Sequence, residues 1–290
     1  MKILLIGSNG QLGTDLQPRL REQGDTVVAL DHNCFEISDP AQIEAALDQH
    51  LPDAVINTSA FHKVEQCEVE ALRAFEVNAV APRNLAVACR KRGAVLVHFS
   101  TDYVFSGSAN RPYQETDATD PLSVYGTSKL AGEKLVAAYG EKYILVRTCG
   151  LYGVAGSSGK GGNFVETMLK KAAGGETIRV VDDQVLTPTF TGDLAAAVAR
   201  LIHTSAHGLY HISAEGQCSW YEFARKIFEL SGLKVDLRPV KTAEFASPVR
   251  RPAFSVLSKN KLNAVGITMP GWEEGLRRYL LARTQRGAPA

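Results

Sequence analysis

The 290-residue sequence lacks an excess of charge of either sign, because 32 Lys and Arg residues oppose 31 Asp and Glu residues, for a formal net charge of +1. This balance gives no reason to expect nucleic acid or an anionic membrane as a partner. Long hydrophobic runs are also missing, so neither a signal sequence nor a membrane span is predicted. Five cysteines are scattered without a C-x-x-C pair, which favours a soluble protein of the reducing cytoplasm.

A metal site is not expected either, since no H-E-x-x-H motif occurs. His203, His207 and His211 recur every four residues, but Gly208 should end a helix between the second and the third. The segment 156–162 (GSSGKGG) looks like a phosphate loop without the Walker spacing. We interpret it as a mobile loop that closes over a substrate diphosphate.

Apolar runs alternate with helical patterns over residues 1–150. Strands are predicted at 2–6, 26–30, 54–57, 95–100 and 144–147, and helices at about 11–23, 40–50, 68–92 and 123–139. Such alternation predicts an α/β fold, a doubly wound parallel-sheet Rossmann domain that binds a dinucleotide. Ligands in this architecture bind beyond the carboxyl ends of the strands.

The regular alternation ends after Gly150. Shorter helices are predicted near 163–173, 191–203 and 219–231, and strands near 177–182 and 209–213. We expect residues 151–290 to form a smaller C-terminal substrate-binding domain, with sheet elements from about 177–213 interleaved with the first domain.

A glycine fingerprint follows the first predicted strand. Gly7, Gly10 and Gly13 have the spacing G-x-x-G-x-x-G where a helical pattern begins. Glycines allow a tight turn and close approach of the backbone to a diphosphate, whose charge then meets the positive end of the helix. The spacing indicates the short-chain branch of the dinucleotide-dependent enzymes.

Two acidic residues are candidates for the adenosine end of the cofactor. Asp31 ends the second predicted strand, where an acidic residue commonly meets the adenosine ribose. A carboxylate there opposes a 2'-phosphate and favours NADH, although it can also cap a loop. Asp39 either contacts the adenine or caps the next helix, and we favour the cap.

Tyr125 and Lys129 lie four residues apart in a predicted helix and therefore share one of its faces. Because a nearby cation favours phenolate, we expect Lys129 to lower the pKa of Tyr125 from about 10 toward neutrality. Tyr125 is then a general acid for a carbonyl oxygen during hydride transfer. The alternative is an ordinary amphipathic helix.

Longer motifs resemble those of the dTDP-4-dehydrorhamnose reductases, in the extended short-chain dehydrogenase/reductase superfamily, over nearly the whole length. The most specific is STDYVFSG at 100–107. The others are GSNGQLG at 7–13, FEVNA at 75–79, PLSVYGTSK at 121–129, LAGE at 130–133 and RPAFS at 251–255. The resemblance implies NAD(P)H-dependent reduction of the C4 ketone of dTDP-4-dehydro-β-L-rhamnose to dTDP-L-rhamnose, with NADPH as cofactor and NADH also accepted.

The resemblance also assigns roles to individual residues. The implied catalytic residues are Thr101, Tyr125 and Lys129. The implied cofactor-binding residues are Gly7, Asn9, Gly10, Gln11, Leu12, Gly13, Asp31, Asp39, Ser59, Ala60, Asn78, Tyr125 and Lys129. The implied substrate-binding residues are Thr101, Asp102, Val64, Tyr125, Asn163 and Arg251.

Other readings of three of these residues stay open. Thr101 is expected to hydrogen-bond the C4 oxygen, and its alternative is a turn cap at a strand end. Arg251 offers a fork for a diphosphate, or is a solvated surface arginine. Asn78 positions the catalytic helix or caps a turn.

The sequence departs from the family pattern at two places, Gly150, where better-known members carry an aromatic residue, and His62, which faces the substrate or only a loop. A magnesium site at a dimer interface, found in some members, is not carried over, and a homodimer is left open. Two other functions compete with the reductase. One is a sugar-nucleotide epimerase or dehydratase, which Asp102 keeps open, and the other is a non-catalytic protein such as the regulatory subunit of methionine adenosyltransferase.

Overall fold

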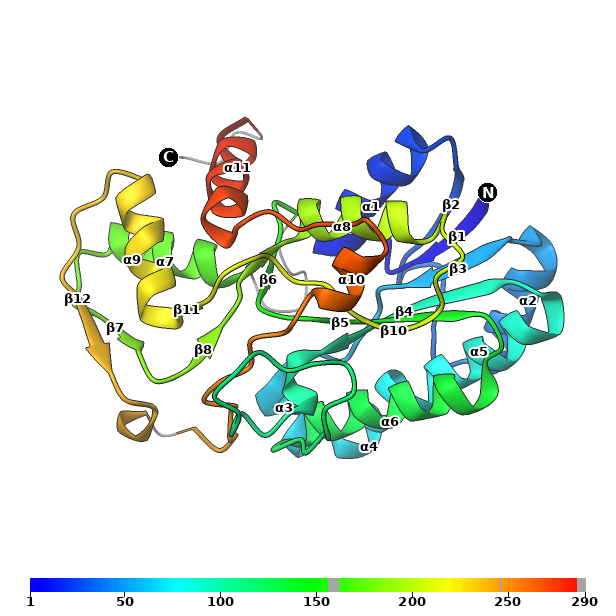
Figure 1. Cartoon of the computed structure of the whole chain (residues 1–290), viewed down its shortest axis with the longest axis horizontal. Coiled ribbons are helices and arrows are strands. Elements are labelled where there is room, and N and C mark those ends of the chain that lie inside the picture. The colour runs from blue at the N-terminus through cyan, green and yellow to red at the C-terminus, as the bar shows by residue number, and fades with distance from the viewer. Residues whose placement is uncertain (156–161, 246, 286–290) are drawn as a thin grey trace.

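Six parallel strands form the main sheet of the computed structural model, which describes residues 1–155, 162–245 and 247–285. Their order is β10-β5-β4-β3-β1-β2 (Figure 1). The strands are β1 (Lys2–Ile6), β2 (Thr26–Leu30), β3 (Ala54–Asn57), β4 (Val95–Thr101), β5 (Tyr143–Thr148) and β10 (Gly208–His211). All neighbours pair in parallel, and the doubly wound α/β fold predicted from the sequence is confirmed.

Helices cover both faces of this sheet (Figure 1). Along β1, Ile3 and Leu5 pack into one core cluster and Leu4 and Ile6 into the other, so both faces of the strand are buried. One face carries α1 (Gln11–Glu22) and α8 (Thr191–Leu201), and the other carries α2 (Pro40–His50), α5 (Ala81–Arg92) and α6 (Val124–Tyr139). The unbroken apolar run of β1 follows from this double burial.

The single helix expected at 68–92 is instead a series of shorter elements. These are α3 (Val64–Val69), α4 (Ala71–Phe75), a π-helical turn (Glu76–Val80) and then α5. Pro82 lies in the first turn of α5, where its missing N–H costs nothing. The π turn is a local widening of the kind often found at functional sites.

The smaller part of the molecule carries two-stranded sheets and the remaining helices. The strands are β6 (Leu151–Tyr152), β7 (Ile178–Val181), β8 (Val185–Leu186), β9 (Thr189–Phe190), β11 (Cys218–Ser219) and β12 (Leu237–Val240). The helices of this part are α7 (Phe164–Ala173), α9 (Trp220–Leu230) and α11 (Trp272–Gln285), with a 3-10 turn at Thr242–Glu244. A second 3-10 turn (Asp102–Val104) follows β4, and α10 (Asn260–Ala264) packs against the main sheet. The aromatic side chains of this part gather in a core of their own.

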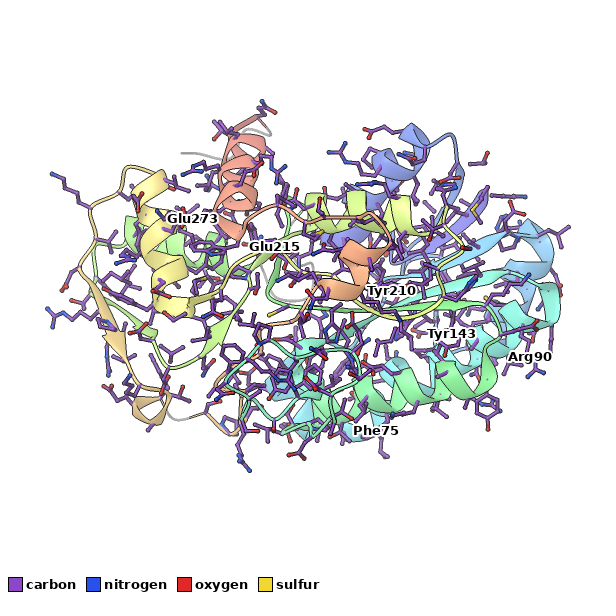
Figure 2. All side chains as sticks on the ribbon, viewed as in Figure 1. Phe75, Arg90, Tyr143, Tyr210, Glu215 and Glu273 are labelled. Atoms are coloured by element: carbon purple, nitrogen blue, oxygen red, sulfur yellow. The ribbon has the colours of Figure 1, made fainter. Side chains whose placement is uncertain are left out.

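The interleaving of the two parts differs from the expectation. The strand predicted near 177–182 is β7, which pairs with β12 outside the main sheet, whereas β10 joins the main sheet at its edge. The chain returns a second time at α10, next to Tyr210 of β10 (Figure 2). Lys261 of α10 lies over the ring of Tyr210 and donates to the carbonyl of Leu209. The predicted phosphate-loop-like segment 156–161 lies outside the described residues.

None of the helices that the structure describes has the length and apolar content to span a bilayer.

A buried ion pair fixes α6 to the sheet. Arg147 of β5 donates through Nε and Nη2 to the two carboxylate oxygens of Glu133 on α6, over 2.8 and 2.6 Å. Both side chains are at most 4% exposed. The Arg147 guanidinium also lies 5.0 Å from the centre of the Phe105 ring. The pair therefore joins α6, β5 and the turn after β4 at one point.

We expect Glu133→Gln to lower the free energy of unfolding by about 3–5 kcal/mol, because it leaves a buried guanidinium without its counter-charge. Urea denaturation measures this loss. The control is Glu22→Gln, which removes the exposed partner of Arg19 and should cost less than about 1 kcal/mol. Equal losses in the two variants would contradict the role given to the buried pair.

Candidate active site

A cavity of about 1130 Å³ opens at the carboxyl ends of β1, β3, β4 and β5. Most of the residues predicted from the sequence line it. They are Gly7, Asn9, Gly10, Gln11, Leu12, Asp31, Ser59, Ala60, Val64, Thr101, Asp102, Tyr125, Lys129 and Asn163. Gly13, Asp39, Asn78 and Arg251 are not among the lining residues.

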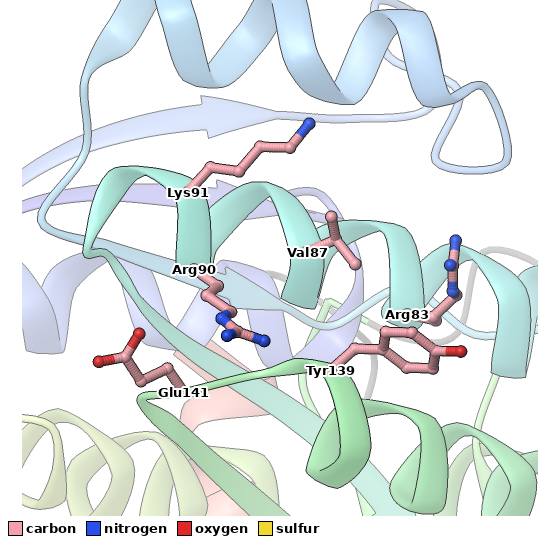
Figure 3. Close-up of a pocket in the computed structure, with 6 residues that line it drawn as sticks. All are labelled: Arg83, Val87, Arg90, Lys91, Tyr139 and Glu141. Carbon is pink, nitrogen blue, oxygen red and sulfur yellow. The ribbon is translucent and has the colours of Figure 1, made fainter.

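A second hollow of about 510 Å³ lies on the outer surface of α5 and α6 (Figure 3). Its walls are Arg83, Val87, Arg90, Lys91, Tyr139 and Glu141. The Arg83 guanidinium lies 4.5 Å from the centre of the Tyr139 ring. No predicted site residue lines this hollow, so the large cavity is the candidate active site.

The glycine turn at one end of the cavity fits a dinucleotide diphosphate. Gly7 has φ +78°, and a Cβ on Gly13 would lie 2.2 Å from the Gly7 carbonyl oxygen, so α1 packs directly against the turn. The N-cap residue of α1, Gly10, supplies no side-chain cap, and the first turn contains no acidic residue. The first amides of the helix are therefore open to an anion. Gln11 ties this turn to the opposite wall by accepting the amide of Gly153 at 3.0 Å.

At the adenosine end, Asp31 and Asp39 behave differently. Asp31 lines the cavity and also accepts the amide of Asn33 at 2.8 Å. Asp39 caps α2 by accepting the amide of Ala41 at 2.9 Å and is absent from the cavity wall. Its carboxylate serves the helix N-terminus, which is the alternative favoured from the sequence, and a contact with the cofactor stays a prediction.

Arg73 is a lining residue that sequence reasoning missed. It donates to Ser38 Oγ at 2.9 Å and to Glu76 Oε2 at 2.8 Å, and it lies 3.4 Å from Glu36 Oε1. Glu36 lines the same part of the wall. No sequence signal marks Arg73, because its partners come from separate segments of the chain.

Asn78 lies in the π turn, fully buried and outside the cavity lining, and its role as a cofactor ligand stays a prediction. Its Oδ1 accepts the amide of Phe61 at 2.9 Å, and its Nδ2 donates to the Phe61 carbonyl at 2.9 Å and to Ser128 Oγ at 3.0 Å. Asn78 thus joins the loop after β3 to α6, which is the positioning alternative. His62 lines the cavity nearby.

The three catalytic candidates meet in the wall of the cavity. Thr101 is the last residue of β4, and Tyr125 and Lys129 lie in the first turns of α6, which Ser123 caps. Burial raises the pKa of Tyr125, and a hydrogen bond with Thr101 opposes the rise. Burial lowers the pKa of Lys129 to about 8. The expectation that Lys129 holds the Tyr125 pKa near neutrality is therefore wrong in this state of the protein, and Tyr125 keeps its proton.

Thr101 has a second partner, the buried Asp102. The Thr101 hydroxyl donates to Asp102 Oδ1 at 3.0 Å, and the thiol of Cys149 donates to Oδ2 at 3.0 Å. Thr101 also caps the following turn by accepting the amide of Tyr103 at 3.2 Å. Burial raises the pKa of Asp102, while hydrogen bonds from Ser255, Cys149 and Thr101 oppose the rise. Sequence reasoning missed the part that Cys149 plays here.

The two remaining substrate candidates are already bound to other protein groups. Asn163 caps α7 by accepting the amide of Glu166 at 3.1 Å, and it donates to the Gly153 carbonyl at 3.0 Å and to Tyr279 Oη at 3.2 Å. Its amide is therefore used within the protein, although it lines the cavity. Arg251 forms an ion pair with Glu65, whose side chain is part of the wall.

The place of the missing aromatic residue is closed by a leucine. A Cβ on Gly150 would lie 3.0 Å from Leu186 Cδ1 and 3.2 Å from Pro188 Cα. Leu186 lines the cavity together with Phe164 and Trp220, whose ring centres are 4.5 Å apart. This apolar wall was not predicted, because its residues come from three separate elements.

The three regularly spaced histidines do not converge. His203 contacts Asp25 at 2.9 Å, and His211 lies 3.4 Å from Arg147. His207 is exposed and contacts the Ser205 carbonyl. Within residues 1–155, 162–245 and 247–285, no group of three or more His, Cys, Asp or Glu side chains is arranged to hold a metal ion.

Comparison with known proteins agrees with this geometry. The family described as "RmlD substrate binding domain" matches residues 1–285. The chain is 42% identical to a spore coat polysaccharide biosynthesis protein, SpsK, of Bacillus subtilis over 98% of each chain, and 39% identical to a dTDP-4-dehydrorhamnose reductase of Streptomyces griseus over 97% of this chain and 91% of the relative.

A solved structure gives the same result. A dTDP-4-dehydrorhamnose reductase of Bacillus anthracis, crystallised in complex with NADP, superposes with a TM-score of 0.92 at 40% identity, over 97% of this chain and 99% of the other. Fold and sequence agree over nearly the whole chain. The protein belongs to the dTDP-4-dehydrorhamnose reductase family of the extended short-chain dehydrogenases/reductases.

Proposed function

We propose that the protein reduces the C4 ketone of dTDP-4-dehydro-β-L-rhamnose to dTDP-L-rhamnose, with NADPH as cofactor and NADH also accepted. One observation carries this proposal. Thr101, Tyr125 and Lys129 line the same cavity as a glycine turn whose helix amides are open to a diphosphate. A reductase needs a proton donor and a dinucleotide site within reach of one carbonyl group.

Each side chain has a defined part in this reaction. Reduced nicotinamide, when bound, supplies hydride to the C4 carbon. Tyr125 gives its proton to the C4 oxygen, and its raised pKa keeps that proton in place until negative charge develops there. Thr101 donates a hydrogen bond to the same oxygen, and Lys129 binds the nicotinamide ribose.

The dehydratase alternative has less support. A dehydratase would need the carboxyl group of Asp102 to reach the substrate. Both oxygens of this group instead accept hydrogen bonds from the protein, one from Thr101 and one from Cys149. We also propose a cytoplasmic enzyme, supported by five cysteines that are all free. The homodimer stays a prediction, and the exposed side chains of Val69 and Leu72 on α3 and α4 support it.

Tyr125→Phe should lower kcat by roughly 10²- to 10⁴-fold, because it removes the proton donor, while the Kd for NADPH changes little. Steady-state assays of nicotinamide oxidation and a fluorescence titration measure the two effects. Tyr103→Phe is the matched control, since the Tyr103 ring packs edge-on against Tyr125 at 5.9 Å and also lines the cavity. Retention of more than about a tenth of kcat in Tyr125→Phe would exclude it as the general acid.

Asp31→Ala should raise kcat/KM for NADPH relative to NADH, because it removes a carboxylate that repels a 2'-phosphate. The effect should be larger at low salt, since screening weakens repulsion between exposed charges. Kinetics with both cofactors at two ionic strengths test this. A ratio that does not change would show that Asp31 does not face the ribose.

Arg251→Ala should raise the KM for the nucleotide sugar by about tenfold or more with little change for NADPH, because a charge-assisted hydrogen bond to a diphosphate is worth roughly 1.5–3 kcal/mol. Glu65→Gln is the complementary variant, since it weakens the ion pair that holds Arg251. It should lower the same KM. If both variants shift the KM in the same direction, Arg251 acts through the Glu65 pair rather than on the diphosphate.

A further inference from the structure

Lys129 lies at one end of a buried chain of hydrogen bonds that the proposed reaction does not use. The amide of Ser59 donates to Asn57 Oδ1 at 3.0 Å. Asn57 Nδ2 lies 3.1 Å from His98 Nδ1, and His98 Nε2 lies 3.4 Å from Lys129 Nζ. Asn57 and His98 are fully buried, and Lys129 is 2% exposed. The chain runs from the loop after β3, through β3 and β4, to the catalytic helix.

The backbone sets the direction of every bond in this chain. The Ser59 amide can only donate, so the atom of Asn57 that faces it is the carbonyl oxygen, and the Asn57 NH₂ group faces His98. His98 must accept at Nδ1 and therefore carries its proton on Nε2. That N–H faces Lys129 Nζ, which can accept only as an uncharged amine, because an ammonium group has no lone pair.

The other groups around Lys129 do not supply a free counter-charge. On its own helix, Glu133 favours the ammonium form, but Glu133 is bound by both nitrogens of the Arg147 fork from β5. Tyr125, one turn earlier on α6, keeps its proton because burial raises its pKa. From β4, burial lowers the pKa of His98 and outweighs a hydrogen bond with the Asn57 backbone that raises it, so the imidazole is neutral.

We propose that Asn57 and His98 are positioning residues that hold Lys129 as an uncharged hydrogen-bond acceptor in the free enzyme at alkaline pH, and that binding of the nicotinamide cofactor is there coupled to the uptake of one proton by this amine. The inference rests on the proposed cofactor role of the cavity. A ribose offers hydroxyl oxygens and the cofactor carries a diphosphate, and both favour the ammonium form. Above pH about 8, Lys129 is then the cation beside Tyr125 only in the complex with the cofactor.

The coupling between cofactor binding and proton uptake has a definite sign, and it operates in a definite pH range. A lysine whose pKa is about 8 in the free enzyme and near 10.4 in the complex takes up about one proton at pH about 9, and almost none well below pH 8, where both forms are already charged. Calorimetric titration of the enzyme with NADPH, in two buffers of different ionisation enthalpy, measures this number directly. We expect about one proton per bound cofactor at pH about 9.

Asn57→Asp should reverse the direction of the hydrogen bonds between residue 57, His98 and Lys129, and the new side chain has almost the same shape. The new carboxylate accepts from both the Ser59 amide and His98 Nδ1–H, which leaves His98 Nε2 free to accept from an ammonium group. The proton uptake at pH about 9 should fall by at least about half, because Lys129 is then charged before the cofactor binds. His98→Gln adds no charge and should act in the same direction, since its amide oxygen can face the ammonium group.

The tautomer of His98 tests the proposal in the unmodified enzyme. Nitrogen NMR of protein labelled at its seven histidines, with His98 identified by its absence in His98→Gln, should show an unprotonated Nδ1 and a protonated Nε2 without cofactor. A proton on Nδ1, or uptake that is equal in the wild type and both variants, would overturn the proposal. Failure of NADPH to bind at all would instead refute the proposed function.

Discussion

Close contact between α6 and its neighbours is the constraint on which the site depends. A Cβ on Gly126 would lie 2.3 Å from the Tyr103 carbonyl oxygen, and one on Gly132 would lie 2.1 Å from the Asn78 carbonyl oxygen. Only glycine permits these approaches. The Glu133–Arg147 pair fixes the same helix to β5, so Tyr125 and Lys129 are carried on a helix held at three points. Packing therefore explains why Gly126, Gly132 and Glu133 stand in the motifs around Tyr125 and Lys129.

Burial at this contact decides the chemistry of the site. On a surface, water would stabilise both ions and weaken their interaction, so a tyrosine and a lysine one helical turn apart would keep pKa values close to their ordinary ones. Inside the protein, the loss of water raises the pKa of Tyr125 and lowers that of Lys129. Burial therefore shifts both groups toward their neutral forms, and above pH about 8 Lys129 is mostly uncharged in the free enzyme. Tyr125 must keep its proton until hydride transfer, and a raised pKa meets this need. The positive charge of Lys129 is needed only when the oxygen of the substrate gains negative charge.

The sequence was sufficient to predict most of the sheet and the glycine turn, because buried parallel strands are continuous apolar runs and their ends follow one another in order. The bounds of β1, β2 and β3 match the prediction, and Gly7, Thr101 and Tyr125 line one cavity as expected. The competition for hydrogen bonds within the protein could not be predicted from the sequence. The side chains of Asp39 and Asn163 are taken by helix N-termini and that of Asn78 by a loop carbonyl and amide, and none of these partners can be read from spacing along the chain. The apolar wall around Leu186 was missed for the related reason that tertiary contacts create it.

The hydroxyl of Thr101 shows how a small change of protonation can direct the reaction. It has one proton and two neighbours that can take it, Asp102 and Tyr125. When Asp102 is ionised, the hydroxyl donates to it and presents only lone pairs toward the cavity. Burial raises the pKa of Asp102, and the Cys149 thiol is a weak donor, so the carboxylate is poorly stabilised there. A protonated Asp102 would donate to one of its neighbours and release the Thr101 proton toward the C4 oxygen. In the proposed reaction, Asp102 would therefore orient Thr101 and would not be an acid for the substrate.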